Sequence, residues 1–159
     1  MKKNKISKVL GRMVFDSRGM PTIEAEVKLE NNITTKSIAP SGASKGKNEA
    51  LEKRDLRKSY LGKGVFDNIK SINKSINDAL VGLHVNDQNK IDMVLLELDG
   101  TINKSNLGAN TTIAVSMAVL KAAAKNENKD LWHYLSYDKE CLLPLPEVQI
   151  FGGGIHAKG

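Results

Sequence analysis

A short loop in the first third of the chain carries the residues best suited to chemistry. Residues 40–50 read PSGASKGKNEA and lie between a strand-like run and a helix-like run. The hydroxyls of Ser41 and Ser44 and the loop carbonyls are hard oxygen donors of the kind that Mg2+ binds. Gly42 and Gly46 give the segment backbone freedom. On the residues alone, the alternative is a plain strand-to-helix connection, because most short loops only connect.

A histidine near the end of the sequence is the second candidate. His156 follows the glycines at 152–154 and the apolar run at 148–151, so its backbone has room to approach a ligand closely. The titration range of imidazole also suits switching near neutral pH. The alternative is an incidental histidine, as most lone histidines near a chain end are. His84 and His133 belong to no such motif and are expected to be surface or packing residues.

The strands that must position these residues follow from the period of the apolar side chains. Apolar and charged residues alternate over residues 23–29, which predicts a strand with one buried face. Apolar runs at 6–15 and 33–39 predict a strand on either side of it. The turn at 16–21 and the Asn pair at 31–32 favour short connections, so the three strands form an antiparallel meander.

Helical periodicity follows the loop. It predicts four helices, over residues 65–80, from an N-cap at Asp87 to a stop at 99–100, over 109–126 and over 131–135. The expected inner faces hold Val65, Ile69, Ile72, Ile76 and Leu80, then Ile91, Val94, Leu95 and Leu98, and finally Ile113, Met117, Leu120 and Ala124. Strands first and helices afterwards predict an α+β fold with the helices on one face of the sheet.

The last stretch reads as a separate unit. Two prolines within residues 142–146 predict an extended linker, and residues 148–151 have the composition of a buried strand. We therefore expect one domain over residues 1–138, and over 139–159 a linker with the first strand of a second domain. On this interpretation the chain is the front part of a longer protein.

Composition limits the class of protein. With 159 residues, 40% of them hydrophobic, the chain is typical of one globular domain. A single cysteine, Cys141, excludes an internal disulfide and fits the cytoplasm. No signal peptide and no run of membrane-spanning length is recognisable.

The net charge of +6 raises the question of nucleic-acid binding. The lysines are scattered among acids, and in residues 52–55 the signs alternate as they do on a solvated helix surface. Aromatic residues make up only 4% of the chain, too few for a stacking platform. Both observations argue against a nucleic-acid partner.

Five motifs together resemble the enolase family, the phosphopyruvate hydratases. They are FDSRGMPT at 15–22, PSGAS at 40–44, YLGKGV at 60–65, LDGTINKS with LGAN at 98–110, and GGIHA at 153–157. They stand in the family's order, at nearly its spacing, along almost the whole chain. The resemblance implies the family's amino-terminal capping domain, followed by the first strand of a truncated α/β barrel.

The resemblance also implies roles for particular residues. The loop would be the mobile lid of the active site, and its residues are Ser41, Gly42, Ala43, Ser44, Lys45 and Gly46. Ser44 would bind the second Mg2+ through its carbonyl and hydroxyl. His156 would be catalytic, near the substrate phosphate and the departing hydroxyl. Arg12 and Glu24 would form ion pairs between the subunits of a homodimer, unless they are merely exposed strand charges. Asn110 would be a cap or would pack against the barrel.

The implied reaction is the Mg2+-dependent, reversible dehydration of 2-phosphoglycerate to phosphoenolpyruvate in glycolysis. Removing a proton beside a carboxylate creates negative charge that metal ions stabilise. The family's base lysine, acid glutamate and first-metal carboxylates belong to the later barrel. We therefore expect the 159-residue chain alone to be inactive.

Departures from the family's pattern leave two alternatives open. They are Met20, Lys45, Asn48, Gln149, Gly152 and Ile155, each standing where the family usually has another residue. One alternative is a divergent lyase of the enolase superfamily that acts on another carboxylate, since one fold hosts several chemistries. The other is a non-catalytic basic interaction module, which would bind DNA or RNA in a salt-sensitive way.

Overall fold

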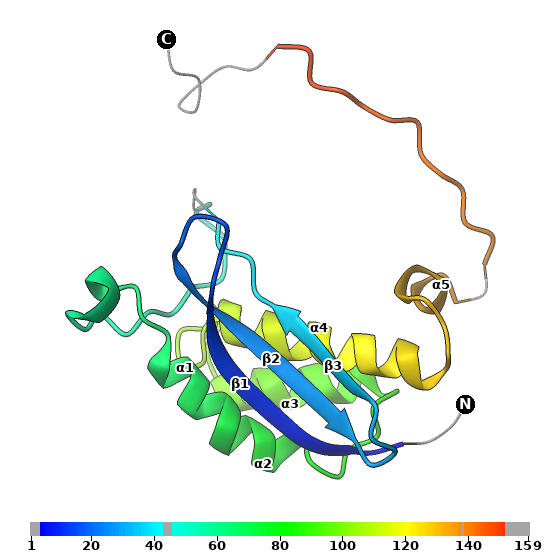
Figure 1. Cartoon of the computed structure of the whole chain (residues 1–159), viewed down its shortest axis with the longest axis horizontal. Coiled ribbons are helices and arrows are strands. Elements are labelled where there is room, and N and C mark those ends of the chain that lie inside the picture. Colours follow the sequence, from blue (N-terminus) through cyan, green and yellow to red (C-terminus); the bar gives the residue numbers. More distant parts are fainter. Residues whose placement is uncertain (1–3, 43–45, 138, 152–159) are drawn as a thin grey trace.

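An antiparallel sheet of three strands is formed by the first part of the chain (Figure 1). The computed structural model describes residues 4–42, 46–137 and 139–151. The strands are β1 (Ile6–Phe15), β2 (Pro21–Leu29) and β3 (Thr34–Ile38), in the order β1-β2-β3. The predicted meander is confirmed.

The two faces of this sheet differ in character. Alternate residues of β2 point into the core and are fully buried, namely Ile23, Ala25, Val27 and Leu29. On the opposite face, Arg12 lies across from Glu24, and Glu26 lies across from Lys36. The period of two therefore separates a dry face from a charged face, as the sequence predicts.

Most of the helices lie on the dry face of the sheet, whereas the short first and last ones lie to its sides, as Figure 1 shows. In chain order, they are η1 (Ser59–Gly62), α1 (Phe66–Ser71), η2 (Ile72–Ile76), α2 (Asn77–Leu80), α3 (Gln88–Asp99), α4 (Ala109–Asn126) and α5 (Leu131–Leu135). α4 packs on β2 and β3, while α1, η2 and α2 pack along β1. The predicted α+β class is confirmed.

The helix predicted over residues 65–80 is present, with one turn of a different kind. α1, the π-helical turn η2 and α2 follow one another without a break in helical backbone. Two asparagines of this region accept hydrogen bonds from free amides of the edge strand β1. The N–H of Gly11 donates to Asn73 Oδ1 at 2.6 Å, and that of Val9 donates to Asn77 Oδ1 at 2.9 Å. The helix therefore covers an edge that would otherwise be open to pairing.

The inner face predicted for α4 is wrong except for Ala124, which is buried. Ile113, expected in the core, is 49% exposed, whereas the side chains that meet the sheet are mostly small. The buried apolar residues of α4 are Ala114, Val115, Ala118, Val119, Ala122, Ala123 and Ala124. Small side chains let the helix approach the sheet closely, and the Thr35 hydroxyl donates to the Ala118 carbonyl at 2.8 Å. α3 follows its prediction in part, since Ile91 and Leu95 are buried but Leu98 is 37% exposed.

The helix-like interpretation of the residues just after the loop is also wrong. Residues 46–58 form neither a helix nor a strand. In this segment the Asp55 carboxylate accepts hydrogen bonds from the N–H groups of Phe66, at 2.7 Å, and Asp67, at 3.0 Å. Asp55 thereby caps α1 from outside the helix. Val65, at the N-cap position itself, makes no side-chain hydrogen bond. A Cβ on Gly64 would lie 2.7 Å from Asp55 Oδ2, so a glycine is needed there.

The last described residues leave the sheet and helices (Figure 1). Residues 139–151 contain no helix or strand, and Val148, Ile150 and Phe151 are each at least 78% exposed. The strand expected at 148–151 is thus not formed in this chain. A buried strand needs a neighbouring strand, and no described residue offers one to this run.

The remote cap of α1 makes a testable prediction. Asp55→Ala should lower the free energy of unfolding by about 1 to 2 kcal/mol, because it leaves two helix N–H groups without an acceptor. Urea unfolding of the 159-residue chain measures the change. Asp78→Ala is the matched control, because this exposed carboxylate of α2 bonds only the neighbouring Asn77 side chain. Equal stability of the two variants would contradict the capping role.

Candidate functional site

The loop at 40–46 is described at both of its ends. Pro40, Ser41 and Gly42 form its first stem, and residues 46–50 form its second stem. Ala43, Ser44 and Lys45 lie outside the described residues, as does His156, so the roles expected for them stay predictions. The structure bears on how the two stems are held.

Two arginines hold the first stem. Arg18 Nη2 donates to the Ser41 carbonyl at 2.7 Å, and Arg54 Nη2 reaches the Ser41 hydroxyl at 3.4 Å. Arg18 belongs to the turn between β1 and β2, where Asp16 Oδ1 accepts from the N–H groups of Arg18 and Met20 at 2.9 and 2.8 Å. These bonds, the one from Met20 foremost, lower the pKa of the Asp16 carboxyl. The first stem is thus tied to an ordered turn.

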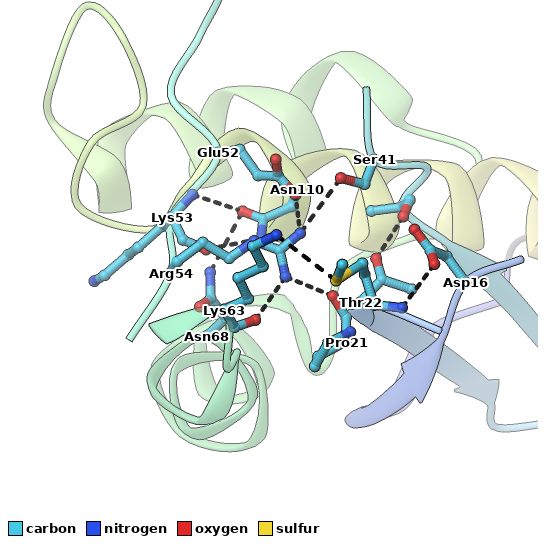
Figure 2. Close-up of polar contacts among 12 residues, drawn as sticks. Asp16, Pro21, Thr22, Ser41, Glu52, Lys53, Arg54, Lys63, Asn68 and Asn110 are labelled. Atoms are coloured by element: carbon cyan, nitrogen blue, oxygen red, sulfur yellow. Dashed lines mark hydrogen bonds and ion pairs between the residues drawn. The ribbon is translucent and has the colours of Figure 1, made fainter. Parts of the chain in front are cut away.

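Arg54 is the most connected side chain at this stem, as Figure 2 shows. Its Nη1 donates to the carbonyls of Pro21 and, at 2.8 Å, Lys63, while its Nη2 pairs with the Glu52 carboxylate. The side chain is only 15% exposed. The alternating charges of residues 52–55, interpreted above as a solvated helix surface, are therefore internal contacts, and that interpretation is wrong.

The second stem is paired to a distant part of the chain. The N–H of Leu51 donates to the Asn103 carbonyl at 2.7 Å, and the N–H of Ala109 donates to the Leu51 carbonyl at 2.8 Å. The Asn110 side chain continues this pairing, because it accepts from the Lys53 N–H at 3.2 Å and donates to the Lys53 carbonyl at 3.0 Å (Figure 2). Asn110 is 5% exposed and makes no capping bond, so it acts inside the domain.

Gly108 makes this close approach possible. A Cβ at this position would lie 2.5 Å from Asn110 Oδ1 and 2.6 Å from the Lys53 Cβ. Its φ of +91° is also one that other residues rarely adopt. The LGAN motif can therefore be explained physically. Gly108 leaves room for the segment around Lys53, and Asn110 binds the backbone of that segment.

A buried carboxylate organises the loop that carries this motif. Asp99 is 1% exposed, and its carboxylate accepts from the Leu107 N–H at 2.7 Å, the Thr101 N–H at 3.0 Å and the Thr101 hydroxyl. Burial by itself would raise the pKa of the Asp99 carboxyl, but the hydrogen bonds from Thr101 and Leu107 outweigh it and lower the pKa below its usual value. The carboxylate is therefore ionised at neutral pH.

Two cavities flank the loop stems. One has a volume of about 390 Å³ and is lined in part by Gly46, Asn110 and the exposed Ile113. The other has a volume of about 380 Å³ and is lined in part by Arg18, Arg54 and Lys63. Gly42 and Glu52 line both cavities, so the stems form the wall between them. A ligand that reached the loop would meet a pocket of mixed polar and apolar lining on one side and cationic side chains on the other.

No cluster of metal-binding side chains is found in the described part of the chain. Among residues 4–42, 46–137 and 139–151 no group of three or more His, Cys, Asp or Glu side chains could hold a metal ion. Both oxygens of Ser41 face guanidinium groups, which repel a cation. The described oxygens of Ser41 are therefore not placed to bind a metal ion in this structure.

Arg12 and Glu24 meet on the charged face of the sheet. Arg12 Nη1 lies 3.2 Å from Glu24 Oε1 and 2.9 Å from Glu26 Oε2, and Lys36 Nζ lies 3.4 and 3.6 Å from the same oxygens. The Arg12 hydrogen bond lowers the pKa of the Glu26 carboxyl, and Glu26 in turn raises the pKa of Arg12. Within this chain the four charges satisfy one another, and the expected contact between subunits stays a prediction.

The other histidines lie away from the loop. His84 is exposed, and the His133 ring stacks on Trp132 with 5.3 Å between ring centroids. None of the described helices combines the length and the apolar character needed to cross a membrane.

Comparison with known proteins decides the family. Residues 6–135 match the family described as Enolase, N-terminal domain. The chain belongs to the enolase family. It is 48% identical over 153 residues to the Enolase of Ehrlichia canis (strain Jake), an alignment that covers 96% of this chain and 36% of that protein. The chain therefore spans little more than a third of the length of this enolase, and the match confirms the resemblance seen in the motifs.

Several residues that hold the loop stems in this enolase domain were not predicted from the sequence. Arg54, Asp55 and Asp99 each act through contacts with distant segments, and the charge pattern around them gave no sign of burial. The signal that was available is the spacing of Asp99, Gly108 and Asn110 within the LDGTINKS and LGAN motifs. Nothing in the sequence singled out Lys53, the residue whose backbone pairs with Asn110.

The buried carboxylate of this enolase domain gives a pH-dependent prediction. Asp99→Asn should lower the free energy of unfolding at pH 7 by about 2 to 3 kcal/mol, because a neutral amide cannot accept all three bonds. The wild-type contribution is fully present above the unfolded pKa of about 4 and is lost as the pH falls through the lower folded pKa. Asp99→Asn should therefore lose less stability between pH 5 and pH 2 than wild type does, as urea unfolding across that range would show.

Asp16 and Glu26 titrate in the same window in both proteins, so the difference isolates Asp99. Parallel pH profiles for wild type and variant would contradict the assignment. Asp78→Asn serves as the surface control, since that side chain is exposed.

Proposed function

We propose that this chain is the amino-terminal part of an enolase that converts 2-phosphoglycerate reversibly to phosphoenolpyruvate, using Mg2+, in glycolysis. The observation that carries the proposal is the 48% identity to an enolase over 96% of this chain. The geometry of the loop at 40–46 supports it, because both of its described stems are anchored to the domain.

The chain's own contribution to this reaction is the lid. Residues 41–46 would close over the substrate and exclude water, which is a common role of loops at active sites. Ser44 would supply ligands to the second Mg2+, and bound Mg2+ stabilises the negative charge that develops on the substrate carboxylate. His156 would lie near the substrate phosphate and the departing hydroxyl. The proton-abstracting base would come from the remaining part of the longer protein, so the 159-residue chain alone would be inactive.

Turnover of the full-length protein tests this proposal. The rise in ultraviolet absorbance on forming phosphoenolpyruvate should require Mg2+, stop with a chelator and return when Mg2+ is restored. Ser44→Ala should lower kcat/KM by about 100-fold or more, since a displaced active-site group commonly costs that much. Ser75→Ala is the matched control, because this exposed hydroxyl only bonds the Ser71 carbonyl within its own helix.

Two results would contradict the proposal in different ways. A full-length protein with no turnover of 2-phosphoglycerate at saturating Mg2+ would favour the divergent lyase or the interaction module. If the full-length protein is active but Ser44→Ala has the same kcat/KM as Ser75→Ala, the proposed reaction stands and the role of Ser44 in it is contradicted.

We also propose that the full-length protein is a cytoplasmic homodimer in which Arg12 and Glu24 meet the partner subunit. Arg12→Ala should weaken dimerisation by about tenfold or more, which corresponds to about 1.4 kcal/mol. Sedimentation velocity across a range of concentrations measures the change, with Lys90→Ala on the exposed side of α3 as control. Unchanged dissociation for Arg12→Ala would limit these charges to the intrachain pairs described above.

A further inference from the structure

Arg54 joins segments that are far apart in the sequence. Its guanidinium donates to carbonyls of Pro21, at the start of β2, and Lys63, before α1, and it reaches the hydroxyl of Ser41. The Glu52 carboxylate completes its set of partners. With 15% of the side chain exposed, this is a largely buried cation whose four terminal N–H donors, on Nη1 and Nη2, have acceptors.

The neighbouring arginine shows what an ordinary surface arginine does in this segment. Arg57 is 55% exposed and pairs only with Asp67, which is 45% exposed. An exposed pair of that kind contributes little to stability. Arg54 therefore stands out by its burial and by the number of segments that it connects, and Arg57 offers a matched control.

Arg54 connects the first stem of the loop to the segment that follows the second stem. The chain passes from Ser41 through the loop to the second stem, pairs with residues 103–110 through Leu51 and Lys53, and then reaches Arg54. From there the guanidinium returns to Ser41. The two described stems are thereby fixed relative to each other, so less entropy is lost when they are held in one arrangement around a ligand.

We propose that Arg54 is a positioning residue for the reaction of the full-length enolase, because it fixes the first stem of the loop against the segment that holds the second. The proposal rests on the proposed function above. It assigns Arg54 no contact with the substrate, and its effect passes through Ser41.

A lysine cannot take over this role. The Pro21 and Lys63 carbonyls and the Ser41 hydroxyl lie at different ends of the planar guanidinium fork. A lysine has one compact ammonium group and cannot reach these acceptors together. Arg54→Lys keeps the charge and most of the volume, so it separates the fork geometry from the charge.

The experiment uses the full-length protein and has two readouts. The first is kcat/KM for 2-phosphoglycerate in Arg54→Lys, Arg54→Met and Arg57→Met. Both Arg54 variants should lose about 10- to 100-fold, with Arg57→Met within about twofold of wild type. The double variant Arg54→Met/Ser41→Ala should lose no more kcat/KM than Arg54→Met alone, because the effects of two substitutions that remove the same contact do not add.

The second readout is hydrogen exchange of the amides of residues 42–50, which needs no turnover. Exchange should be about tenfold faster in Arg54→Lys than in Arg57→Met or wild type. A full-length wild type that fails to turn over 2-phosphoglycerate would overturn the proposed function, while faster exchange in Arg54→Lys would still support the anchoring role. Unchanged exchange, an activity loss equal to that of Arg57→Met, or additive effects with Ser41→Ala would each overturn the positioning role.

Discussion

The side chain of Asn110 pairs with the backbone of Lys53, and the arrangement of the loop depends on this contact. Residues 46–58 have no helix or strand of their own, so their backbone groups need partners elsewhere. The loop at 103–110 provides them, and Gly108 leaves the space in which the two segments meet. The contacts with residues 103–110 therefore hold the second stem and, directly after it, the backbone that carries Arg54.

Near the loop, side-chain acceptors bind many of the backbone N–H groups that other backbone groups would bind in a helix or sheet. Asp99 binds the amides of its own loop, Asp55 caps α1 from a distance, and Asn73 and Asn77 satisfy the edge of β1. Each of these acceptors lies where a backbone amide would otherwise be buried or open without a partner. The part of the domain near the loop is therefore ordered by polar contacts, whereas the sheet and α4 are ordered by apolar packing.

The regular part of the fold could be predicted because it follows from the period of the apolar residues. β1 and α4 have the bounds that the sequence predicts, and Asp87 and Gly100 cap α3 as expected. The buried face of α4 could not be predicted in the same way. The prediction weighted large apolar residues, but the sheet selects alanines that allow close approach, and this leaves Ile113 beside the loop cavity.

The irregular part could be predicted only by resemblance. Alternating charges in residues 52–55 are typical of a solvated surface, and only the tertiary structure shows that Arg54 and Asp55 face two different partners. The motifs indicated the family and singled out the loop and Asn110, whereas the role of Gly108 emerges only from the structure. They did not indicate which segment those residues bind, because Lys53 lies more than fifty residues away in sequence from Asn110.

In this enolase domain the loop at 40–46, the proposed lid, is held by both of its described stems. A crystal structure of the full-length protein with Mg2+ and phosphoenolpyruvate tests it most directly. We expect residues 43–45 to contact the bound ligand or its metal, while Arg54 stays within hydrogen-bonding distance of Ser41 and Asn110 stays paired with Lys53. Residues 43–45 far from the ligand, or Ser41 released from Arg54 when the ligand is bound, would contradict it.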